Sequence, residues 1–342
     1  MSPTQTVSVP ARHQLQGVLT GRATAIWIAT ALLFAVSPLV APGSLTSAPL
    51  LSMLPFAAVL AIVAAGQTLV VQQRGLDLSV PGMIALGAAL GTGLPQEHGW
   101  PLGLAVLAGI AAPTVFGIAN GVLVTIFGIS PLVATLGMNA VLLGTVFSVA
   151  NGTPSGAAAD LNQFALDRTL GVPNTALIAT VVIVVAGVVT QRSIVGRKLT
   201  AVGVSNRAAA VIGIRVNVLQ IVAYAFAGLC YGAGGVLLAG YTKTPPLFLG
   251  DSYLLPSVAA VVLGGTALTG GLSSVVASGV AAVFLTQLGQ LLRALGWSDA
   301  SQLVTQSLVL LLVVLARELV PRLLVRRSRP PAVRTPEPVG AP

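Results

Sequence analysis

Long apolar runs alternate with short polar connections along almost the whole chain. A helix that crosses a bilayer needs about 20 consecutive apolar residues, and runs near that length recur through the 342 residues. The pattern therefore predicts an all-α polytopic membrane protein with about ten transmembrane helices. The third, eighth and tenth runs are short, and each is a candidate re-entrant segment. The predicted spans are Ala23–Ala41, Leu50–Val71, Val80–Leu94, Pro101–Phe127, Pro131–Ala150, Thr175–Val189, Val218–Gly240, Leu254–Leu268, Ser274–Leu295 and Ser301–Leu315.

The polar stretches at the two ends complete the predicted organisation. Residues 1–22 form an N-terminal tail, residues 23–319 the transmembrane domain and residues 320–342 a basic, Pro-rich tail. A cleaved signal peptide is the alternative for the first apolar run, because the following APGSLTSAP resembles a cleavage site. The 19-residue length of that run favours a first transmembrane helix.

Composition supports a membrane protein, and charge predicts its orientation. The chain is 55% hydrophobic and 7% charged, whereas soluble domains carry roughly 25% charged residues. With the N-terminus inside, fourteen of the 17 Lys and Arg residues fall on the cytosolic side, in agreement with the positive-inside rule. Both termini are therefore predicted to be cytosolic. The basic residues lie in loops without interleaved aromatic residues, so they do not indicate a nucleic-acid partner.

The connector Gly196–Asn217 between two long apolar runs is predicted to be a cytosolic docking element. Together with Arg192 just before it, this segment carries five Lys or Arg residues and no acid. A short capped helix between two spans favours contact with a cytosolic partner, and we place the coupling loop at residues 192–217. Residues suited to a turn with an N-cap, to about two helical turns and to a helix end follow in order: Gly203 with Ser205 and Asn206, then Arg207–Ile212, then Gly213.

Small residues and two similar hairpins suggest how the spans pack. Glycines four residues apart let helices approach closely. Two hairpins that run in the same direction, Leu69–Ala88 and Val262–Val283, each turn at a segment that contains Gly and Leu-Ser. This similarity indicates a parallel internal repeat of the kind that transporters use. The glycine pairs are Gly87 and Gly91, Gly117 and Gly121, and Gly228 and Gly232.

Asp77 is the acid closest to the membrane interior, and two interpretations of it are open. An intramembrane acid is costly and usually functional, which suggests a gate or a proton site. Alternatively, Asp77 satisfies free amides at a helix start or pairs with Arg74, while Ser79 caps the third helix. The structural interpretation is the favoured one.

Neutral amides inside the apolar runs offer hydrogen-bond partners to a polar, sugar-like solute. The alternative is hydrogen bonding between helices, worth about 0.6 kcal/mol on average. Tyr224 and Tyr231 fall on one predicted helix and either line the same path or pack. The amides are Gln67, Asn120, Asn139, Gln287 and Gln290.

Several kinds of site are missing from the sequence. Cys230 is the single cysteine and the two histidines are far apart, so neither a disulfide framework nor a Cys- or His-based metal site is expected. There is no G-x-x-x-x-G-K-[ST] phosphate loop, nucleophile elbow or HExxH motif, and no ladder of buried charges. We therefore expect a transporter without enzymatic activity or a cofactor of its own, which takes its energy from a partner.

Four segments carry a family signature over roughly residues 50–318. They are GQTLVVQQRGLDLSVPGMIALGAAL (Gly66–Leu90), ISPLVATLGMNAVLLG (Ile129–Gly144), GRKLTAVGVSNRAAAVIGIRV (Gly196–Val216) and AAVVLGGTALTGGLSSVVASGVAA (Ala259–Ala282). In this order they resemble the membrane permease of bacterial ABC importers of the ribose/xylose/galactose type.

The resemblance implies a type II-like permease bundle in the bacterial cytoplasmic membrane, which dimerises with a second copy or a paralogue. Each subunit would dock one cytosolic ABC ATPase, which binds ATP and Mg²⁺. An extracytoplasmic solute-binding protein would deliver solute to the outer face, where five of the eight acids are predicted to lie. By this resemblance, the loop that contacts the ATPase contains Gly203, Asn206, Arg207, Ala209, Gly213 and Ile214.

Residues inside the bundle follow from the same resemblance. Two sets match signature positions, Asp77 to Ser79 and Gly264 to Thr266. We infer that they gate or line the solute path. The full set predicted for the gate and path is Asp77, Ser79, Gln67, Asn120, Asn139, Gly264, Gly265, Thr266 and Gln287.

The chain departs from the family pattern at a few positions. Gln73 and Arg74 stand where two small residues are usual, Pro81 replaces a common Gly, and Leu272 interrupts a Gly-x-Gly-Ser. Arg74 beside the predicted gate bears on sugar specificity rather than on the fold. The leading hypothesis is an ABC-importer permease for a sugar or related polar solute that works by alternating access. The alternatives are an ion-coupled secondary transporter that uses Asp77 and a membrane scaffold without transport.

Overall fold

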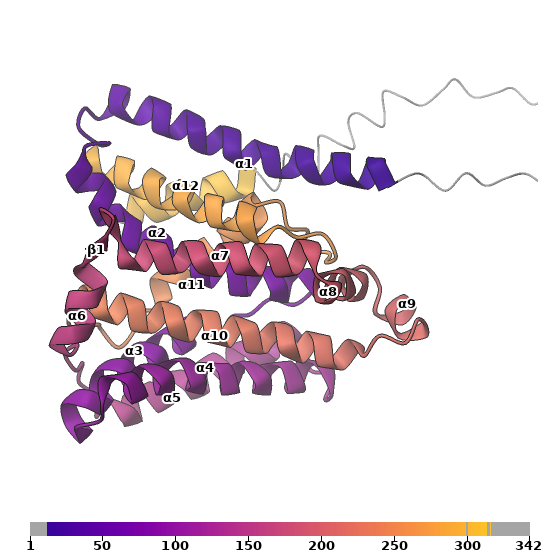
Figure 1. The fold of residues 1–342 in the computed structure, drawn as a ribbon, viewed down its shortest axis with the longest axis horizontal. Coiled ribbons are helices and arrows are strands. Elements are labelled where there is room, and N and C mark those ends of the chain that lie inside the picture. Colours follow the sequence, from indigo (N-terminus) through magenta and orange to yellow (C-terminus); the bar gives the residue numbers. More distant parts are fainter. Residues whose placement is uncertain (1–11, 299, 313–314, 316–342) are drawn as a thin grey trace, which may run out of the picture.

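A bundle of roughly parallel and antiparallel helices makes up the protein (Figure 1). The computed structural model describes residues 12–298, 300–312 and 315. A final helix, Ala300–Leu312, follows the labelled elements. Those elements are α1 (Arg12–Val40), α2 (Ser47–Gln72), α3 (Val80–His98), α4 (Leu102–Thr125), α5 (Pro131–Val149), α6 (Ala159–Leu166), β1 (Arg168–Thr169), β2 (Val172–Pro173), α7 (Asn174–Arg192), α8 (Ile194–Val204), α9 (Asn206–Val211), α10 (Val216–Thr242), α11 (Asp251–Leu263) and α12 (Val275–Ala294).

Each of the ten predicted apolar runs overlaps a helix, although the run Leu254–Leu268 continues past the end of α11 at Leu263. Six of the described helices are long and apolar enough to cross a membrane, namely α2, α4, α5, α7, α10 and α12. Three others are apolar but shorter: Thr24–Val40 within α1, α11, and Ala300–Leu312. α3 starts at the predicted Val80 and continues to His98. The polytopic helical class is confirmed, while the count of ten spans stays a prediction. The predicted C-terminal tail, residues 320–342, lies outside the described residues.

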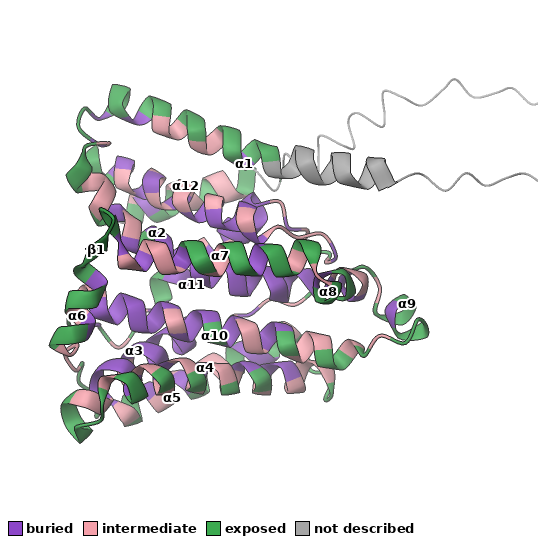
Figure 2. Cartoon of the chain, in the orientation of Figure 1, coloured by how far each residue is buried: buried purple, intermediate pink, exposed green. Residues whose placement is uncertain are grey.

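The core is built around α2 and α10. About 61% and 67% of their most apolar stretches are buried, and α12 reaches 61% as well, against 22% for α4, α5 and α7. Figure 2 shows this as a buried centre under an outer layer with many exposed positions. A fully apolar helix surface suits lipid on the outside and packing on the inside, so exposed apolar side chains on α4, α5 and α7 are expected of a membrane bundle.

Glycines bring α10 into backbone contact with its neighbours. A Cβ on Gly228 would lie 2.3 Å from the carbonyl oxygen of Pro113 in α4, and one on Gly235 would lie 2.2 Å from that of Ile84 in α3. Such distances exclude any side chain at these positions. The predicted Gly117 and Gly87 belong to the same helix crossings, with would-be contacts at 2.4 and 2.7 Å. The interpretation of the glycine pairs as packing positions is therefore confirmed at these sites.

The two ends of the bundle differ. α8 and α9 lie at one end, and α6 with the β1–β2 hairpin lies at the other (Figure 1). The hairpin is antiparallel, with Arg168 opposite Pro173 and Thr169 opposite Val172. The two connections of the proposed internal repeat, α2–α3 and α11–α12, meet directly, because the Gly271 amide donates to the Gln72 carbonyl at 2.9 Å. The repeat itself stays a hypothesis.

Candidate functional site

The α2–α3 connection, residues 73–79, leaves the helical path inside the bundle. Arg74 adopts a left-handed backbone with φ of 65°, which is uncommon for a residue with a side chain. The connection then carries Asp77 and Ser79, both fully buried, to the start of α3. Backbone groups without helical partners are tolerated inside a membrane protein only where protein or a cavity satisfies them.

A buried network, here called the polar cluster, forms around this connection from Gln67, Asp77, Ser79, Asn120 and Tyr231. The Ser79 hydroxyl and amide both donate to Asp77 Oδ1, at 2.5 and 2.9 Å. Asn120 of α4 donates to Ser79 Oγ at 2.9 Å. Tyr231 of α10 donates to Gln67 Oε1 at 2.6 Å, and Gln67 Nε2 reaches the Asp77 carbonyl at 3.4 Å. The cluster thus ties four elements, α2, the α2–α3 connection, α4 and α10, to one point.

Three polar atoms around the cluster have no hydrogen-bond partner among the described residues. They are Asp77 Oδ2, Asn120 Oδ1 and the Tyr224 hydroxyl. Burial raises the pKa of the Asp77 carboxyl from 3.8 to about 6, against the lowering effect of the two hydrogen bonds from Ser79. A buried acid with one free oxygen can therefore hold a proton up to about pH 6. The three free acceptors or donors can receive a polar guest or water.

Arg74 does not pair with Asp77, so that prediction is wrong. Its Nε donates to the Gly203 carbonyl at 2.9 Å, and its Nη2 donates to the Val204 carbonyl. The guanidinium therefore points away from the cluster and binds the C-terminal end of α8. The alternative, that Asp77 satisfies the start of α3, is confirmed by its bond from the Ser79 amide. Ser79 stands at the N-cap of α3, yet its side chain makes no capping bond, because its hydroxyl points to Asp77 instead.

The other predicted path residues are spread over the bundle. Asn139 of α5 lies beside the cluster and accepts from the Gly82 amide at 2.8 Å. Thr266, just after α11, is buried. Gln287 lies elsewhere, because it donates to Ser37 of α1 at 3.0 Å and so joins α12 to α1. Gln287 is therefore a helix-packing residue in this structure rather than a member of the cluster.

Two residues of this region carried no clear signal in the sequence. Thr135 of α5 accepts from the Leu78 amide at 2.9 Å and so supports the connection directly. The sequence predicts Tyr231 only as a residue that lines the path or packs, and its bond to Gln67 shows that it belongs to the cluster. A lone Thr in an apolar run does not differ from other helix-packing residues, so only the fold reveals it.

The connector between α7 and α10 contains two helices rather than the one predicted. α9 is the expected short helix, capped by Ser205, whose hydroxyl accepts from the Ala208 amide at 3.3 Å. Gly213 follows it with a left-handed φ of 81°. The predicted turn at Gly203 is wrong, because this residue lies in the last turn of α8. There it is buried against the rest of the bundle.

Coupling-loop residues divide into a buried and an exposed set. Gly203 and Ala209 are buried, so they shape the connector rather than face a partner. Asn206 and Arg207 are exposed, Gly213 is exposed and Ile214 partly so. Val211 and Ile212 are 87% and 72% exposed. The surface of α9 therefore has an apolar tip, here called the α9 tip (Val211 and Ile212), beside a basic side chain.

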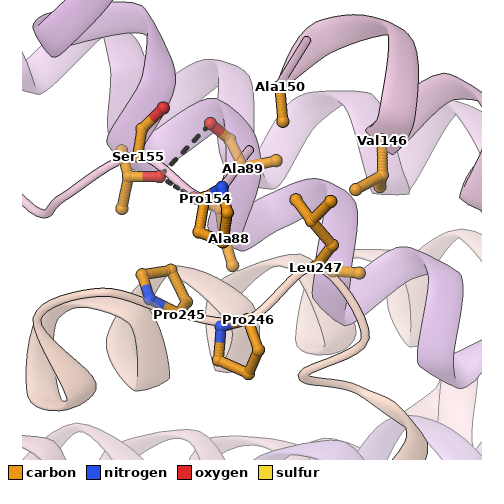
Figure 3. Close-up of a pocket in the computed structure, with 11 residues that line it drawn as sticks. Ala88, Ala89, Val146, Ala150, Pro154, Ser155, Pro245, Pro246 and Leu247 are labelled. Atoms are coloured by element: carbon orange, nitrogen blue, oxygen red, sulfur yellow. Dashed lines mark hydrogen bonds between the residues drawn. The ribbon is translucent and has the colours of Figure 1, made fainter. Parts of the chain in front are cut away.

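A pocket opens at the opposite half of α3, toward the α6 end. In Figure 3 the prolines of two loops, Pro154, Pro245 and Pro246, face Ala88 and Ala89 of α3. Most of the lining residues are Ala, Pro, Val or Leu, and the polar side chains among them are Thr92 and Ser155. The pocket offers few polar groups to a solute, so the polar cluster rather than this pocket is the candidate site.

Comparisons with known proteins point to one family. The family described as "Branched-chain amino acid transport system / permease component" matches residues 50–316. The ribose import permease of Escherichia coli K12 is 33% identical over 84% of this chain and 91% of its own length. That of Bacillus subtilis is 31% identical over 80% and 86%. The galactofuranose transporter permease of Escherichia coli K12 is 28% identical over 85% and 88%. No solved structure matches the chain significantly.

Proposed function

Because the chain belongs to the family of branched-chain amino acid transport system permease components, we propose that it is the membrane permease subunit of an ATP-binding cassette importer for a sugar or related polar solute. It is a transport subunit and not an enzyme. The observation that carries this proposal is the match to a ribose import permease over 91% of that protein's length. A relative named for fructose import in Bifidobacterium longum, 29% identical over 72% of the chain, supports the sugar class.

The partners of the chain follow from this function. A separate cytosolic ATPase would bind ATP and Mg²⁺ and dock on the connector, with the α9 tip at the centre of the contact. An apolar centre beside basic residues suits a protein interface. A solute-binding protein would dock at the α6 end, and a second permease copy or a paralogue would complete the dimer. We propose that this chain binds no cofactor.

The orientation is part of the proposal. The connector and both termini would face the cytosol, and the ten apolar helices would all contribute to the membrane domain. Support comes from the distribution of basic residues: Arg192, Arg197, Lys198, Arg207 and Arg215 all lie on or beside α8 and α9 and are all exposed. The location would be the bacterial cytoplasmic membrane.

The polar cluster is the proposed gate on the solute path. Alternating access would rearrange the α2–α3 connection. The buried polar groups of Asp77, Asn120 and Tyr224 would then come into contact with solute or water. Their free oxygen atoms are suited to hydroxyl groups. Gly264, Gly265 and Thr266 would form the matching turn, where Gly265 has φ of 95°. Gln67 and Asn139 would hold the two sides of the gate.

The ion-coupled alternative is not favoured. The relatives that match over most of the chain are named as import permeases for ribose, fructose and galactofuranose. Asp77 keeps a place in the proposed gate, but as a hydrogen-bonding residue rather than as the site of an ion that drives transport.

Reconstitution tests the proposal. The chain is co-expressed with an ABC ATPase and a solute-binding protein from the same organism, and the complex is placed in vesicles. Radiolabelled ribose, fructose or galactose is added on one side of the membrane, and ATP is supplied on the side that carries the ATPase. We expect uptake of at least one sugar that requires ATP, the ATPase and the binding protein together. Uptake by the chain alone, driven by a proton or sodium gradient, would contradict the proposal. The hydrolysis-deficient ATPase is the control.

A further inference from the structure

α8 is fastened to both turns of the predicted repeat, and not only to its neighbours in sequence. Gln73 Nε2 donates to the Leu199 carbonyl at 3.1 Å, and Gln72 Nε2 donates to Thr200 Oγ1 at 3.1 Å. The same Gln72 nitrogen reaches the Gly271 carbonyl in the α11–α12 connection at 3.2 Å. Three segments that are far apart in the sequence therefore share one set of hydrogen bonds.

Gly203 lies at the centre of this contact. A Cβ on it would stand 2.2 Å from the Gln72 carbonyl oxygen and 2.6 Å from the Gly271 nitrogen. Both obstacles are backbone atoms, which cannot rotate away as a side chain would. On the other side, a Cβ on Gly270 would meet the Gly203 carbonyl oxygen at 2.7 Å. The three backbones are thus packed without room for a methyl group, and relative sliding of α8 and the turns is blocked.

Arg74 closes the contact from the α2–α3 connection. Its guanidinium binds the carbonyl oxygens of Gly203 and Val204, which end α8 and have no helical partner there. A cation at the C-terminal end of a helix also interacts favourably with the helix dipole. To place its side chain there, Arg74 holds a left-handed backbone. This side chain replaces one of the two small residues that are usual in the family, so the link is a feature of this chain.

The connection that Arg74 belongs to leads directly into the polar cluster. Three residues later, Asp77 is bound by Ser79, which Asn120 of α4 binds in turn. Leu78 and Gly82 donate their amides to side chains of α5. A displacement of α8 would therefore reach α4, α5 and the cluster through an unbroken series of hydrogen bonds and packed backbone.

We propose that α8 and the two turns form one rigid joint, which transmits movement of α9 to the polar cluster, with Gly203 and Arg74 as its positioning residues. This inference rests on the proposed function, because it assigns α9 to the ATPase and the cluster to the gate. Because the joint is rigid, a movement of α8 would displace the α2–α3 connection with it, and this connection carries the residues of the gate. Within the joint, Gln72, Gln73 and Gly203 are buried, whereas Arg74 is exposed.

Two substitutions test the joint in the full chain. Gly203→Ala wedges it open. Arg74→Gly removes the guanidinium while leaving a residue that accepts the left-handed backbone, so it separates the side chain from backbone strain. Gly144→Ala is the matched control, since a Cβ there meets nothing within 4 Å. Arg74→Lys keeps the charge but loses the planar fork.

Hydrogen–deuterium exchange of the purified chain gives the first measurement, which needs neither solute nor ATPase. In Arg74→Gly we expect the amides of Leu78, Ser79 and Gly82 to exchange about tenfold faster, the factor that loss of a charged hydrogen bond can produce. Arg74→Lys should fall between Arg74→Gly and the unchanged chain. Gly144→Ala should leave these amides unaffected. Faster exchange confined to α8, with protection kept at Leu78 to Gly82, would overturn the joint even if Gly203→Ala fails to fold.

Transport per ATP gives the second measurement and separates the two proposals. In the reconstituted complex, Arg74→Gly should keep ATPase binding and ATP hydrolysis but move about two- to threefold less sugar per ATP, since the bonds of Gln72 and Gln73 remain. An unchanged ratio together with unchanged exchange would refute the joint while leaving the importer intact. If no sugar uptake occurs in the unchanged complex, the proposed function fails, and the exchange result still decides whether the joint exists.

Discussion

α8 and α9 follow one another in a single connector, yet they have opposite surroundings. Leu199 of α8 is 3% exposed and Gly203 is buried between two turns, whereas Val211 of α9 is 87% exposed. Both helices begin with a serine cap and both belong to a basic, acid-free segment. The difference lies in what covers them: α8 is covered by the protein itself, and the apolar tip of α9 by nothing among the described residues. One connector thus contains a helix packed into the bundle, α8, and a helix exposed for docking, α9.

The largest expected effect is on the free energy of unfolding, which should respond to a substitution in α8 and not to one in α9. Leu199→Ala removes a buried side chain and should lower the free energy of unfolding by about 2–5 kcal/mol. Val211→Ala removes an exposed one and should change it by less than about 0.5 kcal/mol. Thermal unfolding of the detergent-solubilised chain measures both. Equal losses would show that α9 packs on the bundle and would erase the contrast.

A second substitution examines the α2–α3 connection, to which α8 is hydrogen-bonded. Because the pKa of Asp77 is about 6 in the folded protein against an ordinary 3.8, the folded state takes up this proton more readily than the unfolded one. The stability that protonation contributes is therefore complete below about pH 4 and is lost as the pH rises through 6. Asp77→Asn, which cannot ionise, should be more stable than the unchanged chain at pH 7 by up to about 3 kcal/mol.

The pH dependence identifies the cause of that gain. The advantage of Asp77→Asn should shrink steadily as the pH falls from 7 toward about 4, because the carboxyl of the unchanged chain becomes protonated first in the folded state and then in the unfolded state. Unfolding curves between about pH 4 and 7.5 would show the convergence. Asp160→Asn, at an exposed acid of α6, is the control and should show no such gain. A loss of stability at pH 7 would mean that the cluster needs the charged carboxylate.

A substitution in the α9 tip should change ATPase binding rather than the stability of the chain. Ile212→Asp places a charge in the α9 tip and should weaken ATPase binding by about tenfold or more, as expected for an apolar anchor at the centre of an interface. Its unfolding temperature should stay unchanged. Leu170→Asp is the matched control, because Leu170 is 96% exposed at the opposite end of the bundle. Equal loss of ATPase binding in both variants would place the docking surface elsewhere.

The helices could be predicted from the sequence because a bilayer imposes their length locally. The apolar runs Leu50–Val71 and Pro131–Ala150 reappear as α2 and α5 within a few residues. The same holds for α9, where a cap at Ser205 and a stop at Gly213 are properties of neighbouring residues. Local signals predict local structure well.

The site could be predicted only in part, because its bonds join residues far apart in the chain. Four of the amides and polar residues chosen as path candidates do meet, at Gln67, Asp77, Ser79 and Asn120. Their common feature was a polar group in an apolar setting. Gln287 has that feature as well and binds α1 instead. Which buried polar groups pair depends on helix crossings, and a single sequence does not contain them.

α8 could not be predicted for a related reason. Gly203 predicts a turn in the sequence, since glycine in isolation favours bends. In the fold, a Cβ on Gly196 would lie 2.0 Å from the Thr190 carbonyl oxygen, and Gly203 is equally confined. Both glycines serve close approach and not flexibility. A glycine in a helix and a glycine in a turn are identical until the neighbouring backbone is known.

The smallest expected effect compares the two caps. Ser193 accepts from the Gly196 amide at 3.1 Å, and Ser205 accepts from the Ala208 amide at 3.3 Å. Replacing either with Ala should cost about 1 kcal/mol of local helix stability. For Ser193→Ala the cost should appear as a lower unfolding temperature of the whole chain, because α8 is part of the bundle. For Ser205→Ala the unfolding temperature should hold while ATPase binding weakens by several-fold, because only α9 frays. A reversed pattern would mean that α9, and not α8, anchors the connector.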